Sequence, residues 1–127
     1  MPLPIAREGS AVTSTDTLLE SAARTASGAS DQYDALAVAA IVVEINVTAV
    51  SGTSPTLDVD LEDSFDGTTW NKVADVNAAD ITAIGVTVKR LNLVDTPATG
   101  RLRIKYTVGG TNPSFTFTAK VHAIRGA

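Results

Sequence analysis

The sequence contains no cysteine, which excludes disulfide bonds and thiolate metal sites and leaves the redox compartment open. Aromatic residues are scarce, with 1 tryptophan, 2 tyrosines and 3 phenylalanines, and this weakens any model of a site that stacks sugars or bases on aromatic rings. Positive charge is also in short supply, because 10 Lys and Arg stand against 14 Asp and Glu. A nucleic-acid binder needs a basic face to displace phosphate counterions, so we expect no nucleic-acid partner.

Long apolar runs are absent as well. The longest, residues 35–43, has nine residues and is too short to cross a bilayer. The first ten residues also lack the basic region and apolar segment of a secretion signal. We therefore expect a soluble protein with no membrane partner. A chain of 127 residues is long enough to bury a core as one domain, which we place at residues 11–127.

The sequence offers little for catalysis. His122 is the only histidine, and the motifs G-x-S-x-G, H-E-x-x-H and the phosphate-binding loop do not occur. Catalysis at neutral pH usually needs a tuned acid or base, most often histidine. His122 lies on the polar phase of a predicted strand beside Lys120, so we interpret it as a solvated surface residue. We expect no enzyme and no cofactor.

Alternating apolar and polar residues dominate the chain and predict β-strands. The strongest signal is residues 36–50, where one face carries Ile41, Val43, Ile45, Val47 and Ala49. Alternation also predicts strands within residues 18–25, 57–62, 70–76, 101–108 and 114–124, with two short strands in 81–93. An Asp66-Gly67 turn, which supplies the positive φ of a tight hairpin, joins the strands on either side.

Two segments resemble each other. G-T-S-P-T-L-D-V at residues 52–59 matches G-T-N-P-S-F-T-F at residues 110–117, and each follows a long alternating strand. The similarity predicts one strand, corner, strand unit used twice, although Gly/Pro turns also recur for generic reasons. About eight strands with two equivalent units favour an antiparallel β-sandwich of the jelly-roll type.

Residues 1–10, with two prolines and a glycine, read as an extended N-terminal arm outside this domain. It is either a frayed terminus or a segment whose Leu3 and Ile5 dock on a neighbouring subunit.

The central acids invite a calcium hypothesis. Asp58, Asp60 and Glu62 lie about 6 to 7 Å apart along an extended strand, too far for one ion without backbone help. We therefore interpret them as a solvated strand face and expect no metal, while Asp63 with Asp66 at the hairpin end stays a weaker candidate. Trp70 is either a sugar platform or, as we favour, a ring packed over the sheet edge.

Two charged rows are candidates for an interface. One row is acidic (Asp58, Asp60, Glu62) and the other is basic (Arg101, Arg103, Lys105). If their strands are neighbours, the rows pair across the sheet. If the strands lie in opposite sheets, which the jelly-roll order favours, the subunit has an acidic and a basic side and can associate head-to-tail. We expect the second arrangement.

The segments S-G-T-S-P-T-L-D-V-D-L-E-D-S-F-D-G-T-T-W and R-L-R-I-K-Y-T-V-G-G-T-N-P-S-F-T-F resemble tailed-bacteriophage capsid decoration (cement) proteins with a jelly-roll fold. The resemblance covers about residues 37–122. It implies a homotrimer on the outer surface of the virion capsid, made in the host cytoplasm and bridging neighbouring copies of the major capsid protein. It brings no catalytic residues. In this family the N-terminal arm often reaches a neighbour, which suits residues 1–10.

Two other functions stay open. One is another phage structural component, such as a neck, tail or fibre-base protein, which high copy number on DNA-filled heads would argue against. The other is a carbohydrate-binding β-sandwich module. It would need exposed aromatic rings beyond Trp70, Tyr33 and Tyr106.

Overall fold

The structure, a computed structural model, describes residues 12–93 and 100–125. Within these ranges the chain is built from β-strands joined in antiparallel pairs, and they contain no helix. None of these residues therefore belongs to a helix able to cross a membrane. The strands are β1 (Val12–Arg24), β2 (Gly28–Ala29), β3 (Tyr33–Asp34), β4 (Val38–Ser64), β5 (Asn71–Asp75), β6 (Gly85–Asn92) and β7 (Arg101–Arg125).

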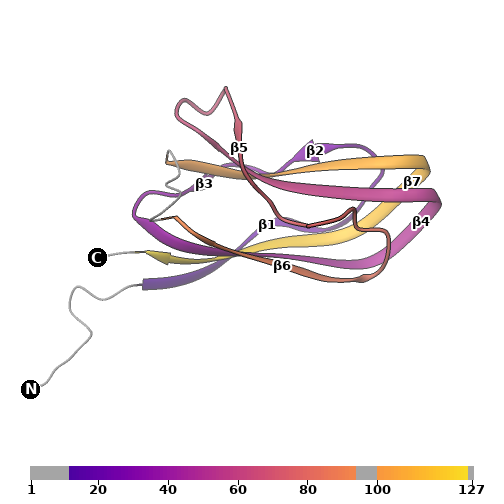
Figure 1. The fold of residues 1–127 in the computed structure, drawn as a ribbon, viewed down its shortest axis with the longest axis horizontal. Coiled ribbons are helices and arrows are strands. Elements are labelled where there is room, and N and C mark those ends of the chain that lie inside the picture. The colour runs from indigo at the N-terminus through magenta and orange to yellow at the C-terminus, as the bar shows by residue number, and fades with distance from the viewer. Residues whose placement is uncertain (1–11, 94–99, 126–127) are drawn as a thin grey trace, which may run out of the picture.

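Two long strands organise the fold. β4 and β7 pair along almost their whole lengths, from Val38 opposite Arg125 to Ser64 opposite Arg101. Both strands bend at one end of the molecule and run back, so that their two halves lie over each other (Figure 1). The first half of β4 and the second half of β7 are flanked by β6 and β1, and the other halves are flanked by β5 and by β2 and β3.

The bends are the two similar segments of the sequence. Gly52 and Gly110 have φ of 110° and 111°, and Ser54 and Asn112 have φ of 49° and 48°. The two corners therefore have matching backbone conformations, and they lie against each other, with Thr53 opposite Thr111. The predicted equivalence of the two segments is confirmed. Each corner, however, bends one continuous strand, because the neighbouring corner bends with it and pairing resumes on the far side.

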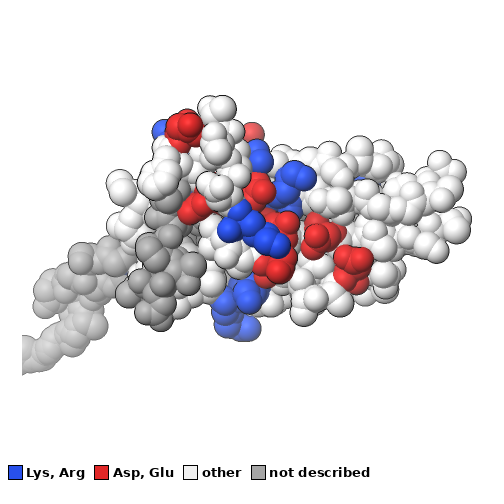
Figure 2. Space-filling model, turned by 45° about the horizontal axis from the view of Figure 1, so that its top comes forward, with Lys and Arg blue, Asp and Glu red and all other residues white. Residues whose placement is uncertain are grey.

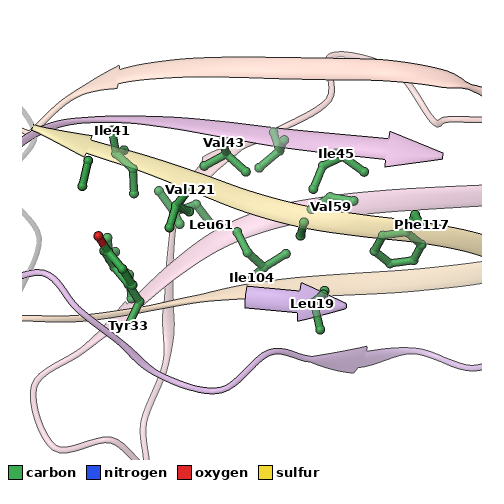
Figure 3. Packing of buried hydrophobic residues seen from close by; sticks show 14 of the residues in the cluster. Leu19, Tyr33, Ile41, Val43, Ile45, Val59, Leu61, Ile104, Phe117 and Val121 are labelled. Carbon is green, nitrogen blue, oxygen red and sulfur yellow. The ribbon is translucent and has the colours of Figure 1, made fainter. Parts of the chain in front are cut away.

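The core lies between the folded halves. Figure 3 shows Ile41, Val43 and Ile45 facing Leu61, Val59 and Ile104 across it. Four of the five residues predicted to share the inward face of residues 36–50 are buried, and the fifth, Ala49, is exposed beside a register shift. The largest fully buried side chains are Phe115, Phe117, Ile41, Ile45, Leu57, Leu61, Leu102, Ile104, Val43, Val47, Val59 and Val121.

Several boundaries differ from the sequence predictions. The described residues form seven strands, not about eight. β4 and β7 each join two predicted strands, residues 81–93 hold one strand in place of two, and the short strands β2 and β3 were not predicted. Residues 81–93 hold the single strand β6, and Ile81 makes only an isolated bridge to Leu57. The hairpin from β4 to β5 is confirmed, but six residues separate its strands, and Gly67 alone has positive φ (78°), so the loop is wider than a two-residue turn. The all-β, antiparallel prediction is confirmed, and the jelly-roll sandwich stays a prediction.

Candidate interaction face

The charged face of the molecule consists of the outward side chains of residues 58–62 in β4, 72–75 in β5 and 101–105 in β7. Here the predicted acidic and basic rows lie on neighbouring strands, with Asp60 opposite Lys105 and Glu62 opposite Arg103. The expectation that the rows occupy opposite sides of the subunit is therefore wrong. It failed because the long strands stay paired around the corner, which keeps residues 57–62 beside 101–108.

Acidic and basic side chains are consequently mixed on the surface. Figure 2 shows them interleaved over the middle of one face, while the end at the corners carries no charge. The sequence agrees, since residues 47–57 and 108–118 contain no Asp, Glu, Lys or Arg. A mixed surface of this kind favours a partner with complementary local charges over a partner of one sign.

Arg103 is the centre of this face. Its Nε donates to Glu62 Oε1 at 2.8 Å, and both side chains are largely buried, with 24% and 16% exposed. Its guanidinium lies 4.4 Å from the centre of the Trp70 ring, a cation–π contact. Trp70 therefore packs on the sheet beside the hairpin loop, as the sequence predicted, and Arg103 covers one side of its ring.

Arg101 and Lys72 are also engaged within the chain. Arg101 donates to the carbonyl oxygen of Phe65 in the hairpin loop. Lys72 Nζ lies 3.0 Å from Asp75 Oδ1, and both side chains are more than half exposed. Their exposure leaves Lys72 and Asp75 accessible to a partner. Because exposed pairs of this kind add little stability, breaking this pair to bind a partner would cost little free energy.

Three acids meet at one end of the charged face. Asp58 and Asp60 from β4 and Asp75 from β5 each place a carboxylate oxygen within 4.8 Å of the others. The expected separation of Asp58 and Asp60 considered one strand alone, and the hairpin brings Asp75 next to both. Among the described residues, this is the one group of three acids close enough together to share an ion.

A proton on this cluster relieves the repulsion between its carboxylates. Partial burial, followed by a hydrogen bond with Asp75 and repulsion from Asp58, raises the pKa of Asp60 to about 6. The pKa of Asp75 moves the other way, chiefly because it accepts a hydrogen bond from Lys72. Asp60 Oδ1 is buried and has no donor beside it. A proton on Asp60 lets it donate to Asp75, whereas two ionised carboxylates could only repel each other.

Asp66, which the sequence offered with Asp63 as a weaker metal candidate, is held by hydrogen bonds within the hairpin loop. Asp66 Oδ1 accepts from the backbone N–H groups of Thr68 and Thr69 and from the Ser64 hydroxyl. These bonds lower the pKa of Asp66, with the Thr69 bond contributing most. Asp66 therefore orders the hairpin loop, and Asp63 is buried on β4 opposite Leu102.

The remaining predicted residues lie away from the charged face. His122 is half-buried on the outward side of β7, and its Nδ1 lies 2.7 Å from the Thr15 hydroxyl. Leu3 and Ile5, proposed as docking residues of the arm, lie outside the described residues.

Asn77 is a buried residue that stabilises the fold and that the sequence did not predict. Its buried Oδ1 accepts from the Val59 backbone N–H at 2.7 Å, and its Nδ2 donates to Ala79 O at 2.8 Å. The segment after β5 is thereby fastened to β4. The signal available in the sequence was a polar residue directly after the predicted strand at residues 70–76.

Comparisons with known proteins identify solved structures with a similar fold. No protein-family model and no curated protein matches the sequence. Among solved structures, the PBSX exported protein XepA has a TM-score of 0.61 at 13% identity, covering 98% of this chain and 40% of XepA. The SPBc2 prophage-derived protein YomS has a TM-score of 0.56 at 11% identity, covering 97% of this chain and 99% of YomS.

A chain in the structure of infectious bursal disease virus, Gx strain, has a TM-score of 0.54 at 13% identity. The match covers 91% of the present chain and 32% of the viral chain. Identities this low show a common fold and nothing beyond it. The chain spans two fifths of XepA and a third of the viral protein, and nearly all of YomS. The chain therefore has an all-β fold that also occurs in prophage-derived proteins and in a protein of a virus particle.

Proposed function

We propose that this chain is a virion structural protein of a tailed bacteriophage, and specifically a capsid decoration protein. It binds the outer surface of the head as a homotrimer and bridges neighbouring copies of the major capsid protein. The observation that carries the proposal is the shared fold with XepA, YomS and the virus-particle protein. The sequence resemblance to decoration proteins, covering residues 37–122, supports the more specific role.

The proposal includes a jelly-roll sandwich as the architecture and no catalytic activity. A decoration protein needs a rigid body, and two strands of 27 and 25 residues paired along their lengths supply one. It also needs surfaces for many copies of one partner, since linked weak contacts raise avidity without strong individual contacts. The charged face supplies such a surface, and we assign it to the capsid contact.

A carbohydrate-binding module has less support. Tyr33 is buried, Tyr106 packs edge-on against Phe117 at 5.4 Å, and Trp70 lies under Arg103. These three rings are thus engaged inside the chain, and beyond them the one largely exposed aromatic ring among the described residues is Phe65. A glycan array with the purified protein tests this alternative directly.

The test of the proposed function uses heads from the phage whose genome carries this sequence. The purified protein is expected to have three times the 13.1 kDa mass of the chain and to saturate expanded, DNA-free heads in a sedimentation assay. Lys105→Glu on the charged face is expected to weaken head binding. The matched variant Lys120→Glu, on the outward side of the other half of β7, is expected to bind normally. A protein that ignores the heads contradicts the proposal.

A further inference from the structure

Two strands at opposite margins of one part of the sheet have a partner on one side only. Across this part the order is β6, β4, β7, β1, since β6 pairs with the first half of β4 and β1 with the second half of β7. Among the described residues, neither β6 nor β1 has a second partner. β6 runs along the lower margin in Figure 1. Within residues 12–93 and 100–125 the sheet therefore has two backbone edges without a pairing partner, one eight and one thirteen residues long.

The β6 edge is apolar at its beginning, while Arg90 and Asn92 are exposed further along the strand. Ile84, Val86 and Val88 expose 68%, 59% and 40% of their surface. An exposed, apolar edge strand is a template for pairing with another chain. Val86 and Val88 lie opposite Asn46 and Glu44, on the outward side of the sheet.

The β1 edge offers matching residues. On its outward side, Thr15 and Thr17 lie opposite His122 and Lys120 and are exposed. Threonine and valine are both β-branched and favour neighbouring positions on a pleated surface. The outward side of β1 therefore suits the outward side of β6.

Charge selects the partner. Lys89 of β6 lies opposite the buried Val43, and Asp16 of β1 lies opposite the buried Val121, so both point to the core side at the two margins. Each successive pair in the order β6, β4, β7, β1 is antiparallel. A second copy that continues the sheet thus brings its β1 antiparallel to β6, with both charges on the same side.

We propose that this chain assembles head-to-tail by pairing β6 of one copy with β1 of the next, with Lys89 opposite Asp16 of the neighbour. In this register Val88 lies opposite Thr17, and Arg90 lies opposite Thr15. Head-to-tail contacts close into a ring when the rotation between copies permits it. The inference depends on the self-association in the proposed function and names its surface.

A competing explanation is that Lys89 and Asp16 protect the edges. Inward-pointing charges on edge strands commonly prevent pairing. The two explanations predict different results when the charges are exchanged. A charge that protects an edge prevents pairing whether it is positive or negative, so reversing its sign leaves assembly unchanged. A charge that attracts the opposite charge of a neighbouring copy loses this attraction when its sign is reversed.

The first experiment measures the mass of Lys89→Asp, Asp16→Lys and the double variant by light scattering after size exclusion, over a range of concentrations. Each single reversal is expected to raise the dissociation constant at least tenfold, and the double variant is expected to restore assembly. Lys105→Asp, on the charged face, is the control and keeps the wild-type mass. Circular dichroism verifies that every variant is folded.

The second experiment is disulfide crosslinking. Because the chain has no cysteine, introduced cysteines are its only thiols. Opposed residues on paired strands have Cα atoms about 4.5 to 5.5 Å apart, within the range of a disulfide. The variant carrying both Lys89→Cys and Asp16→Cys is expected to give a ladder of covalent multimers on a non-reducing gel. The variant carrying Lys105→Cys and Asp16→Cys is expected to stay monomeric on the same gel.

Three results overturn the inference. They are a wild-type monomer at all concentrations, single reversals that keep the wild-type mass, and a Lys89→Cys, Asp16→Cys variant that forms no ladder. Loss of assembly in Lys105→Asp alone would move the self-contact to the charged face. Head binding is measured separately, so a protein that binds heads without this edge pairing refutes the inference and leaves the proposed function standing.

Discussion

The two glycine corners give the sharpest test of how the fold is held together. A Cβ at Gly52 would lie 2.6 Å from Asn112 O and 2.8 Å from Pro113 Cα. A Cβ at Gly110 would lie 2.7 Å from Ser54 O. All of these contacts are with backbone atoms of the opposite corner. Substitution by alanine must therefore push the two corners apart.

Gly100 separates this clash from backbone strain. It has the same φ of 111°, but a Cβ at this position would have no described atom within 4 Å. Alanine at positive φ costs about 1–3 kcal/mol wherever it occurs. Forcing atoms into packed surroundings adds about 1–3 kcal/mol. We therefore expect Gly100→Ala to lose about 1–3 kcal/mol, and Gly52→Ala and Gly110→Ala about 2–6 kcal/mol.

The assay is urea unfolding followed by far-UV circular dichroism, with thermal melts in parallel. At about 4 °C per kcal/mol for a chain of this length, each corner variant is expected to melt about 4–12 °C below Gly100→Ala. The two corner variants should resemble each other, because the contacts are reciprocal.

The reasoning would be refuted if Gly100→Ala were as unstable as Gly52→Ala. That result would mean that backbone strain alone accounts for the loss and that the corners do not depend on close packing. A large difference between Gly52→Ala and Gly110→Ala would contradict their structural equivalence.

Three further predictions concern single residues. Asp60→Asn is expected to raise the melting temperature at pH 8 and not at pH 4. Because the pKa of Asp60 is raised to about 6 in the folded protein, the stability that Asp60 contributes is fully present below pH 3.8 and is lost as the pH rises through 6. After a discount for solvent screening, we expect Asp60→Asn to raise the free energy of unfolding at pH 8 by about 1 kcal/mol. Asn77→Ala is expected to lose about 2 kcal/mol, because the buried Val59 N–H loses its acceptor, and amide exchange at Val59 should accelerate. A double-mutant cycle with Glu62→Gln and Arg103→Met is expected to give a coupling energy of about 1 kcal/mol, since the pair is largely shielded from water.

Exposed residues provide the controls. Asp31→Asn removes a carboxylate from an exposed loop position and should change the stability by less than about 0.5 kcal/mol. Gln32→Ala removes an amide whose contact with Gly67 O is 3.5 Å long and should cost less than about 0.5 kcal/mol. A melting curve for Asp60→Asn that parallels the wild type at every pH would contradict the account of the acidic cluster.

Much of the fold could be predicted from local pattern. Alternation placed Ile41, Val43 and Ile45 on the buried face, and the corner sequences indicated the positions of both bends. The candidate site was less predictable. Asp75 belongs to a short strand with no acidic pattern of its own, and only its pairing with β4 brings it to Asp58 and Asp60.

The sequence by itself determined which side of each strand faces the core, because alternation of apolar and polar side chains is a local property with a period of two residues. It also determined the corners, since glycine followed two residues later by Ser or Asn and then proline restricts the backbone. Tertiary structure decided which strands are neighbours. That choice depends on how β4 and β7 remain paired through both corners, and it set Glu62 beside Arg103 instead of on the far side of the molecule.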